Sequence, residues 1–243
     1  MPVSRGFAWV VTRCLPVLLL LLLVASSAAF PAPEAPLFGV VVQPDRTRPQ
    51  AVGTTFAAVR EAGVQAVRIL PDWRVLQPAK GAYDWGWSDL LVRSAREQGL
   101  QIVFTLGYTP KWASRFSTST EPDGWARNPP AETARWEEYV RKASARYGDA
   151  VTRWQVWEQP SLHQFRGSWK DMRDLAAATM RGTRGRPRTV ILPESGSLNL
   201  SALDETWRWG TDVYSDALGL YPAFEKPEDM LRPLRTLRAM VDR

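Results

Sequence analysis

The sequence predicts an α/β fold built on a mostly parallel sheet, because apolar runs of strand length alternate with segments of helical periodicity. Six such strand–helix units occupy residues 37–243, at a spacing of about 34 residues each. This spacing is close to the repeat of a (β/α)8 barrel, or TIM barrel, of ~250 residues. We therefore predict a barrel of this type with about six of its eight units present.

Each expected strand is a short run rich in Val, Ile, Leu or aromatic residues. In chain order the strands are residues 37–43, 64–70, 100–106, 151–157, 189–192 and 217–221. Three helices are predicted from mainly apolar residues that recur on one helical face, namely Trp87, Leu90, Leu91, Ala95 and Gln98 before Gly99; Trp136, Tyr139, Val140, Ala143 and Tyr147; and Leu231, Leu234, Leu237, Ala239 and Met240. Asn128 is expected to cap the second helix, with Pro129 at its first position.

Six units would leave two parallel strand edges and part of the barrel interior open, whereas a closed barrel has no free edge. Three arrangements would account for this. Another chain supplies the missing units, the ends are covered in some other way, or the chain is a weakly stable product.

The first 29 residues have the order of a secretory signal, with basic residues Arg5 and Arg13, an apolar run over residues 15–24 and small residues over 25–29. We predict cleavage before Phe30, which divides the chain into a signal peptide, 1–29, and a barrel domain, 30–243. The product would be secreted or periplasmic, with no membrane attachment after cleavage. The alternative is an uncleaved anchor, but the apolar segment is shorter than the ~20 residues of a membrane span. The single cysteine, Cys14, lies inside the signal.

Charge and composition exclude little by themselves, because the net charge of +6 suits acidic polysaccharide, nucleic acid or plain solubility. The dense basic segment with Arg181, Arg184, Arg186 and Arg188 lacks interleaved aromatic residues, so we predict a solvated loop and no nucleic-acid partner. No His/Cys cluster with metal-ligand spacing and no Gly-rich phosphate loop is visible, so we predict no metal site and no cofactor.

Three strand ends carry recognisable motifs. The fourth strand ends in Trp154-Gln155-Val156-Trp157-Glu158-Gln159-Pro160. The second strand is followed by Arg68-Ile69-Leu70-Pro71-Asp72-Trp73 and then by Gln77-Pro78-Ala79-Lys80-Gly81-Ala82-Tyr83-Asp84-Trp85. The third ends in Thr105-Leu106-Gly107-Tyr108-Thr109-Pro110-Lys111-Trp112. In order and spacing this series resembles the clan A retaining glycoside hydrolases, nearest to families 39 and 5.

The resemblance implies where the chemistry would lie. In these families the fourth strand ends in Asn-Glu-Pro and the Glu is the general acid/base, whereas this chain has Glu158 in place of the Asn and Gln159 in place of the acid. An amide cannot deliver a proton. The nucleophile of these families follows the seventh strand, beyond Arg243, so restoring Glu at position 159 alone is not expected to restore hydrolysis.

Other residues have alternative interpretations. Glu158 is either a substitute acid or a rim carboxylate bonded to an Arg, and Glu194 is either a second active-face acid or a loop acid. Arg68 matches the Arg that orients the nucleophile in these families, or it forms a salt bridge with Asp72 or Glu158.

Ligand contact is expected from strand-end aromatic residues, since flat rings stack on sugar faces, although aromatic side chains also fill cores. The expected substrate-binding residues are Arg68, Trp73, Trp112, Trp157 and Tyr221, the last standing where relatives have His in a His-Pro-Tyr segment.

We therefore expect an exported glycoside-hydrolase homologue, related to enzymes that cut β-linked polysaccharide, with its own hydrolysis of O-glycosyl bonds impaired. The alternatives are a noncatalytic glycan-binding module and a degenerate gene product. The expected partner is a polysaccharide or oligosaccharide, and a second chain supplying the missing units remains an open alternative.

Overall fold

Six parallel strands lie in one curled sheet in the order β1-β2-β3-β4-β5-β6, so every strand pairs with its neighbour in sequence. The computed structural model describes residues 37–118, 121, 123–158, 164–196, 204, 207–221 and 226–241. The strands are β1 Gly39–Val41, β2 Ala66–Ile69, β3 Gln101–Leu106, β4 Arg153–Val156, β5 Thr189–Gly196 and β6 Ala217–Tyr221. All six predicted strands are confirmed, and with them a partial (β/α)8 barrel.

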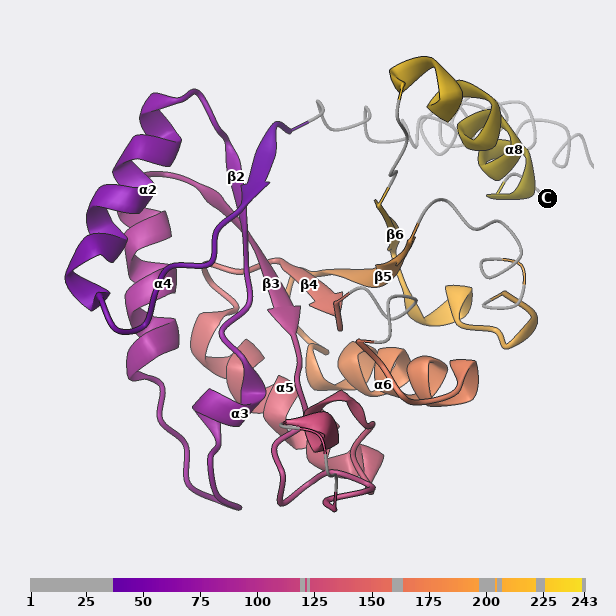
Figure 1. Cartoon of the computed structure of the whole chain (residues 1–243), viewed down its shortest axis with the longest axis horizontal. Coiled ribbons are helices and arrows are strands. Elements are labelled where there is room, and N and C mark those ends of the chain that lie inside the picture. The colour runs from indigo at the N-terminus through magenta and orange to yellow at the C-terminus, as the bar shows by residue number, and fades with distance from the viewer. Residues whose placement is uncertain are drawn as a thin grey trace, which may run out of the picture. The chain divides into compact units, whose positions relative to one another are not determined.

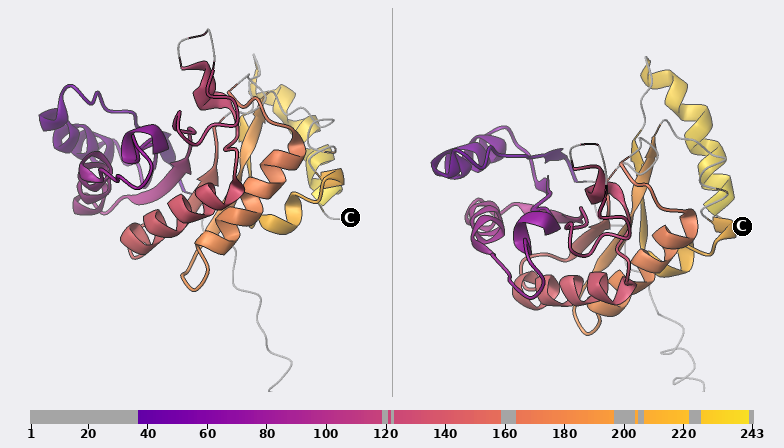
Figure 2. Two further views of the ribbon diagram at one scale, coloured as in Figure 1. Left: turned by 90° about the horizontal axis from the view of Figure 1, so that it is seen from below. Right: turned by 60° about the horizontal axis from the view of Figure 1, so that its bottom comes forward.

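Helices follow the strands and cover the convex side of the sheet (Figure 2). The α-helices are α2 Val52–Glu61, α3 Trp73–Leu76, α4 Gly86–Glu97, α5 Thr133–Tyr147, α6 Trp169–Gly182 and α8 Leu231–Val241. Short 3-10 helices are η1 Pro49–Ala51, η2 Gly124–Arg127, η4 Asp212–Tyr214 and η5 Pro227–Met230. Within the described residues no helix is both long and apolar enough to cross a membrane.

The core lies between the sheet and these helices because side chains alternate along each strand. Residues that face the helices are buried, as shown by Val67, Ile69, Ile102, Phe104, Leu106, Trp154, Val156, Val190 and Leu192. The register pairs Val41 with Arg68, Arg68 with Val103, and Val103 with Arg153, so these four residues share the concave face. That face is less covered, and Val41 is 54% exposed.

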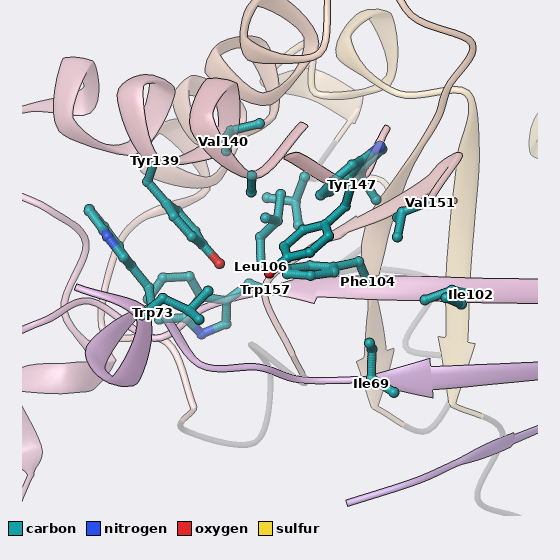
Figure 3. Close-up of a cluster of buried hydrophobic side chains, with 14 of the residues drawn as sticks. Ile69, Trp73, Ile102, Phe104, Leu106, Tyr139, Val140, Tyr147, Val151 and Trp157 are labelled. Carbon is teal, nitrogen blue, oxygen red and sulfur yellow. The ribbon is translucent and has the colours of Figure 1, made fainter. Parts of the chain in front are cut away.

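A cluster of large aromatic side chains fills the core at the carboxyl ends of β2 to β4 (Figure 3). Trp73 stacks on Tyr139 with centroids 4.8 Å apart, and Trp136 stacks on Trp157 at 5.8 Å. All four side chains have 0% exposure. Each removes a large apolar area from water, worth roughly 1.5–3 kcal/mol or more, so this cluster anchors α5 to the strand ends.

The start of α5 differs from the sequence prediction. The helix begins at Thr133 after Glu132, not at Pro129. Asn128 is buried, and its side-chain amide donates to the carbonyl of Phe116 at 3.2 Å. The predicted cap is wrong because Asn128 stabilises the preceding loop rather than the helix. The predicted faces of α4 and α5 are confirmed, and Gly99 follows α4 with a φ of 63°. The predicted face of α8 is only partly correct, since Leu237 is buried but Leu231 is 56% exposed and Ala239 is exposed.

A smaller cluster holds the C-terminal part of the described fold. Leu237 of α8 is buried and packs with Trp207, Leu218, Leu220 and Leu234. Strand β5 joins β6 with a register shift between Leu192 and Ser195. This end of the sheet therefore rests on fewer large side chains than the β2 to β4 region.

Candidate active site

A cavity of about 890 Å³ opens where the carboxyl ends of β1 to β4 meet. Parallel strands of a barrel deliver their following loops to one face, which is where such folds place their binding sites. Its lining comprises Val42, Gln43, Pro44, Arg46, Leu70, Pro71, Asp72, Arg74, Val75, Pro78, Asp84, Trp87, Leu91, Tyr108, Asp123, Trp125 and Glu158. The cavity therefore combines two guanidinium groups, several carboxylates and two partly exposed indole rings.

The end of β4 departs from regular strand geometry. Trp157 has a φ of 66°, a left-handed backbone conformation that residues other than Gly rarely adopt. Its amide still donates to the carbonyl of Leu106 at 2.8 Å. In a regular strand, neighbouring side chains would point to opposite faces. The turn at Trp157 instead buries the indole in the core and brings the carboxylate of Glu158 to the cavity.

An ion pair joins Glu158 to Arg68 across the concave face. One guanidinium nitrogen lies 3.0 Å from Glu158 Oε1, and the two side chains are only 14% and 18% exposed. Arg68 also donates to the Oε1 of Gln155 at 3.5 Å, and the Nε2 of Gln155 donates to the carbonyl of Trp157 at 3.2 Å. Of the two predicted partners of Arg68, Glu158 is confirmed, whereas Asp72 pairs with Arg74.

Tyr108 supplies a second donor to Glu158. Its hydroxyl lies 3.2 Å from Glu158 Oε2 and 3.4 Å from the Oε1 of Gln164. Burial raises the pKa of Tyr108 well above its usual value, and the negative charge of Glu158 raises the pKa further. The phenol therefore remains protonated at ordinary pH and donates to Glu158. Both carboxylate oxygens of Glu158 thus accept hydrogen bonds.

A second ion-pair network, centred on Arg74, also lines the cavity. Asp72 caps α3 by accepting from the backbone N–H of Arg74, and its carboxylate also accepts from the Arg74 guanidinium at 2.6 Å. Arg74 reaches Asp123 at 3.2 Å and lies over the Tyr108 ring. Burial would lower the pKa of Arg74, but the two carboxylates outweigh it and raise the pKa. Arg74 therefore ties the β2 loop to the loop after β3.

The predicted site residues separate into three groups. Arg68 and Glu158 meet near the cavity, as described above. Trp73 and Trp157 have no exposed surface, so their predicted stacking on a sugar is wrong, because both rings pack in the core. Trp112 is partly buried and donates its indole N–H to the carbonyl of Gln77 at 2.9 Å.

The side chains of the remaining predicted site residues are not described by the structure. Gln159 lies outside the described residues. Tyr221 is the last residue of β6 and Glu194 lies within β5, but the description of both covers the backbone alone. Their assigned roles remain predictions.

Sequence reasoning missed Asp72, Arg74, Tyr108 and Asp123 as a connected group, together with Trp87 and Trp125 as the indoles on the cavity. A partial signal existed, since Asp72 and Tyr108 both stand directly after strand ends. Among the described residues, no group of three or more His, Cys, Asp or Glu side chains could hold a metal ion.

Fold and site together define a glycoside-hydrolase-type barrel, with polar side chains from successive strand ends around one cavity. The family model for glycoside hydrolase family 42, described as beta-galactosidase, matches residues 42–166. The chain belongs to this family, which confirms the clan A resemblance.

Three individual proteins are similar to this chain in sequence or in fold. The chain is 27% identical over 189 residues to the beta-galactosidase Bga of Halorubrum lacusprofundi, covering 70% of this chain and 25% of that protein. It is 31% identical over 91 residues to endo-1,4-beta-xylanase A of Halalkalibacterium halodurans, covering 33% and 23%. A family 39 glycoside hydrolase from Bacteroides cellulosilyticus WH2 has a similar fold, with a TM-score of 0.61 at 20% identity over 76% of this chain and 38% of that one. The chain thus spans about a quarter of the curated relatives it matches.

Proposed function

We propose that this chain is an exported glycoside-hydrolase homologue that binds β-linked saccharide at the cavity and hydrolyses it no faster than background. The observation that carries the proposal is the engagement of Glu158 by Arg68 and Tyr108 within the cavity. Export is supported by the sequence of residues 1–29.

Retaining hydrolysis needs one carboxylic acid that protonates the leaving oxygen and one carboxylate that attacks the anomeric carbon. Gln159 stands where the relatives' motif has the acid, and an amide cannot protonate the leaving oxygen. Glu158 is the neighbouring carboxylate, but it accepts hydrogen bonds from a guanidinium and a phenol. To act as the acid, Glu158 would have to give up its ion pair with Arg68 and its hydrogen bond from Tyr108.

Binding needs less than catalysis, and the cavity retains what binding needs. Its volume of about 890 Å³ is in the range of small-ligand sites. Trp87 and Trp125 line it and are partly exposed, while Asp72, Asp84 and Glu158 offer acceptors for sugar hydroxyls. Because each aromatic contact contributes only ~1 kcal/mol beyond area burial, we expect dissociation constants of roughly 1 mM.

The test titrates the purified protein with xylo-, cello- and β-galacto-oligosaccharides while tryptophan fluorescence and product release are followed. We expect saturable binding, no product above the uncatalysed rate, and roughly fivefold weaker binding for Trp125→Ala. Trp209→Ala is the matched control, because Trp209 is 43% exposed and does not line the cavity. Retaining hydrolysis by the unmodified protein would overturn the catalytic part, and no saturable binding by the folded protein would overturn the whole proposal.

A further inference from the structure

A second set of cavities lies on the outer side of the fold, between α4 and α5. One has a volume of about 690 Å³ and is lined by Asp89, Val92, Arg93, Arg96, Glu97, Arg146 and Tyr147. The other, of about 380 Å³, is lined by Tyr83, Trp85, Arg141, Lys142, Ala145 and Arg146. Both include Arg146, so they adjoin along one groove, which we call the α4–α5 groove. It shares no lining residue with the strand-end cavity.

Positive charge dominates this groove. Five cationic side chains line it, Arg93, Arg96, Arg141, Lys142 and Arg146, against the two carboxylates Asp89 and Glu97. The Arg93–Glu97 pair is long, at 3.9 Å, and both side chains are more than 60% exposed, so it neutralises little. Within the described part of the chain, Arg96, Arg141 and Lys142 form no ion pair.

The cations are held in place by packing. Tyr83 and Trp85 stack with centroids 5.0 Å apart, and Lys142 Nζ lies 5.0 Å from the Tyr83 ring centre. Arg146 lies over Trp85 and donates to both oxygens of Asp89, at 2.7 and 2.5 Å. The Tyr147 hydroxyl donates to Asp89 at 2.7 Å. Two of the five cations are therefore pre-positioned, which reduces the entropy cost of binding an anion.

We propose that the α4–α5 groove is a second carbohydrate site, which binds an anionic polysaccharide such as a chain of uronic acid residues. Lys142, held over Tyr83, and the unpaired Arg96 and Arg141 lie along the groove and match carboxylates repeated along a chain. Cationic side chains lie over the stacked rings of Tyr83 and Trp85, which leaves little open ring face for nucleobases to stack on. The choice of polysaccharide over nucleic acid also rests on the export included in the proposed function.

The experiment measures binding of polygalacturonate, by calorimetry and at several NaCl concentrations. The triple variant Arg96→Ala/Arg141→Ala/Lys142→Ala is compared with Arg60→Ala/Arg232→Ala/Arg235→Ala. All six side chains lie on helices, five are exposed and Lys142 is partly exposed, so both triples are expected to fold, and both lower the net charge by the same amount. We expect about tenfold weaker binding for the groove variant, less than twofold for the control, and a smaller salt dependence for the groove variant.

Three results would overturn this inference: no polygalacturonate binding by the unmodified protein, equal weakening in both variants, or equally tight binding of single-stranded DNA that the groove variant abolishes. Neutral xylo-oligosaccharide binding should be unchanged in both triples, since neither touches the strand-end cavity. That second titration separates a failure of the groove from a failure of the proposed function.

Discussion

At the residue scale, the Arg68–Glu158 pair is the clearest link between the sequence and the site. Both side chains are more than four-fifths buried, and the Glu is unexpected at this position from the relatives' motif. Removing one partner of a buried pair leaves the other charge uncompensated, which typically costs more than the pair itself contributes. Glu158 therefore has a structural role in addition to its place on the cavity.

We predict that Arg68→Met lowers the free energy of unfolding by about 3 kcal/mol, while Arg68→Met/Glu158→Gln loses less than the sum of the single changes. Urea unfolding followed by circular dichroism measures each value. Arg93→Met, which breaks an exposed pair, should cost less than about 0.5 kcal/mol. Strictly additive losses at positions 68 and 158 would show that the two side chains are not coupled.

The residue scale also marks a limit of sequence reasoning. Arg68 was a visible anomaly, since a guanidinium inside an apolar strand needs a partner, and one of its two predicted partners is correct. The burial of Trp73 and Trp157 was not visible. Position after a strand does not reveal which way a ring turns, and in Trp157 the direction is set by a backbone conformation that no sequence period encodes.

At the element scale, α6 shows how a local signal and a long-range contact combine. Ser168 and Asp171 form a capping box, and Arg115 from the loop after β3 pairs with Asp171. Burial would raise the pKa of Asp171, but hydrogen bonds from Arg115 and Ser168 outweigh it and lower the pKa to about 2. Since the pKa is lower in the folded state, ionised Asp171 stabilises the fold above pH 4, and this contribution disappears as pH falls toward 2.

We predict that Asp171→Asn lowers the free energy of unfolding by about 1–2 kcal/mol at pH 7. The difference from the unmodified protein should shrink steadily between pH 4 and pH 2. Urea unfolding at a series of pH values measures it, with the exposed Glu61→Gln as the control. A difference that is constant over this pH range would contradict a role for the ionised carboxylate.

Strands and helices were predicted from the sequence more successfully than the site, and the reason is physical. Strands and amphipathic helices carry their own periodicity, so all six strands and the faces of α4 and α5 could be predicted from the sequence. The start of α5 was not, because Asn128 and Pro129 are good capping residues in isolation. The side-chain amide of Asn128 instead donates to the carbonyl of Phe116, which lies 12 residues earlier in the chain, and a local capping pattern does not include such a contact.

At the scale of the whole molecule, the described fold rests on two apolar clusters of unequal size. The large one joins β1 to β5 with α2 to α6, whereas the small one, around Leu237, joins α8 to β6. Apart from Leu237, the members of the small cluster are only partly buried. Regions with few buried apolar contacts open locally at lower free energy than the global value.

We therefore predict that amide hydrogens of α8 and β6 exchange faster than those of β3 and β4, as measured by hydrogen exchange with mass spectrometry. Leu237→Ala should speed exchange in α8 and β6 and leave β3 unchanged, because it removes the centre of the small cluster alone. Leu106→Ala, at a fully buried position of β3, should cost about 2–5 kcal/mol and speed exchange throughout. If Leu237→Ala speeds exchange equally in β3, the two clusters unfold as one unit, and the division of the fold proposed above is wrong.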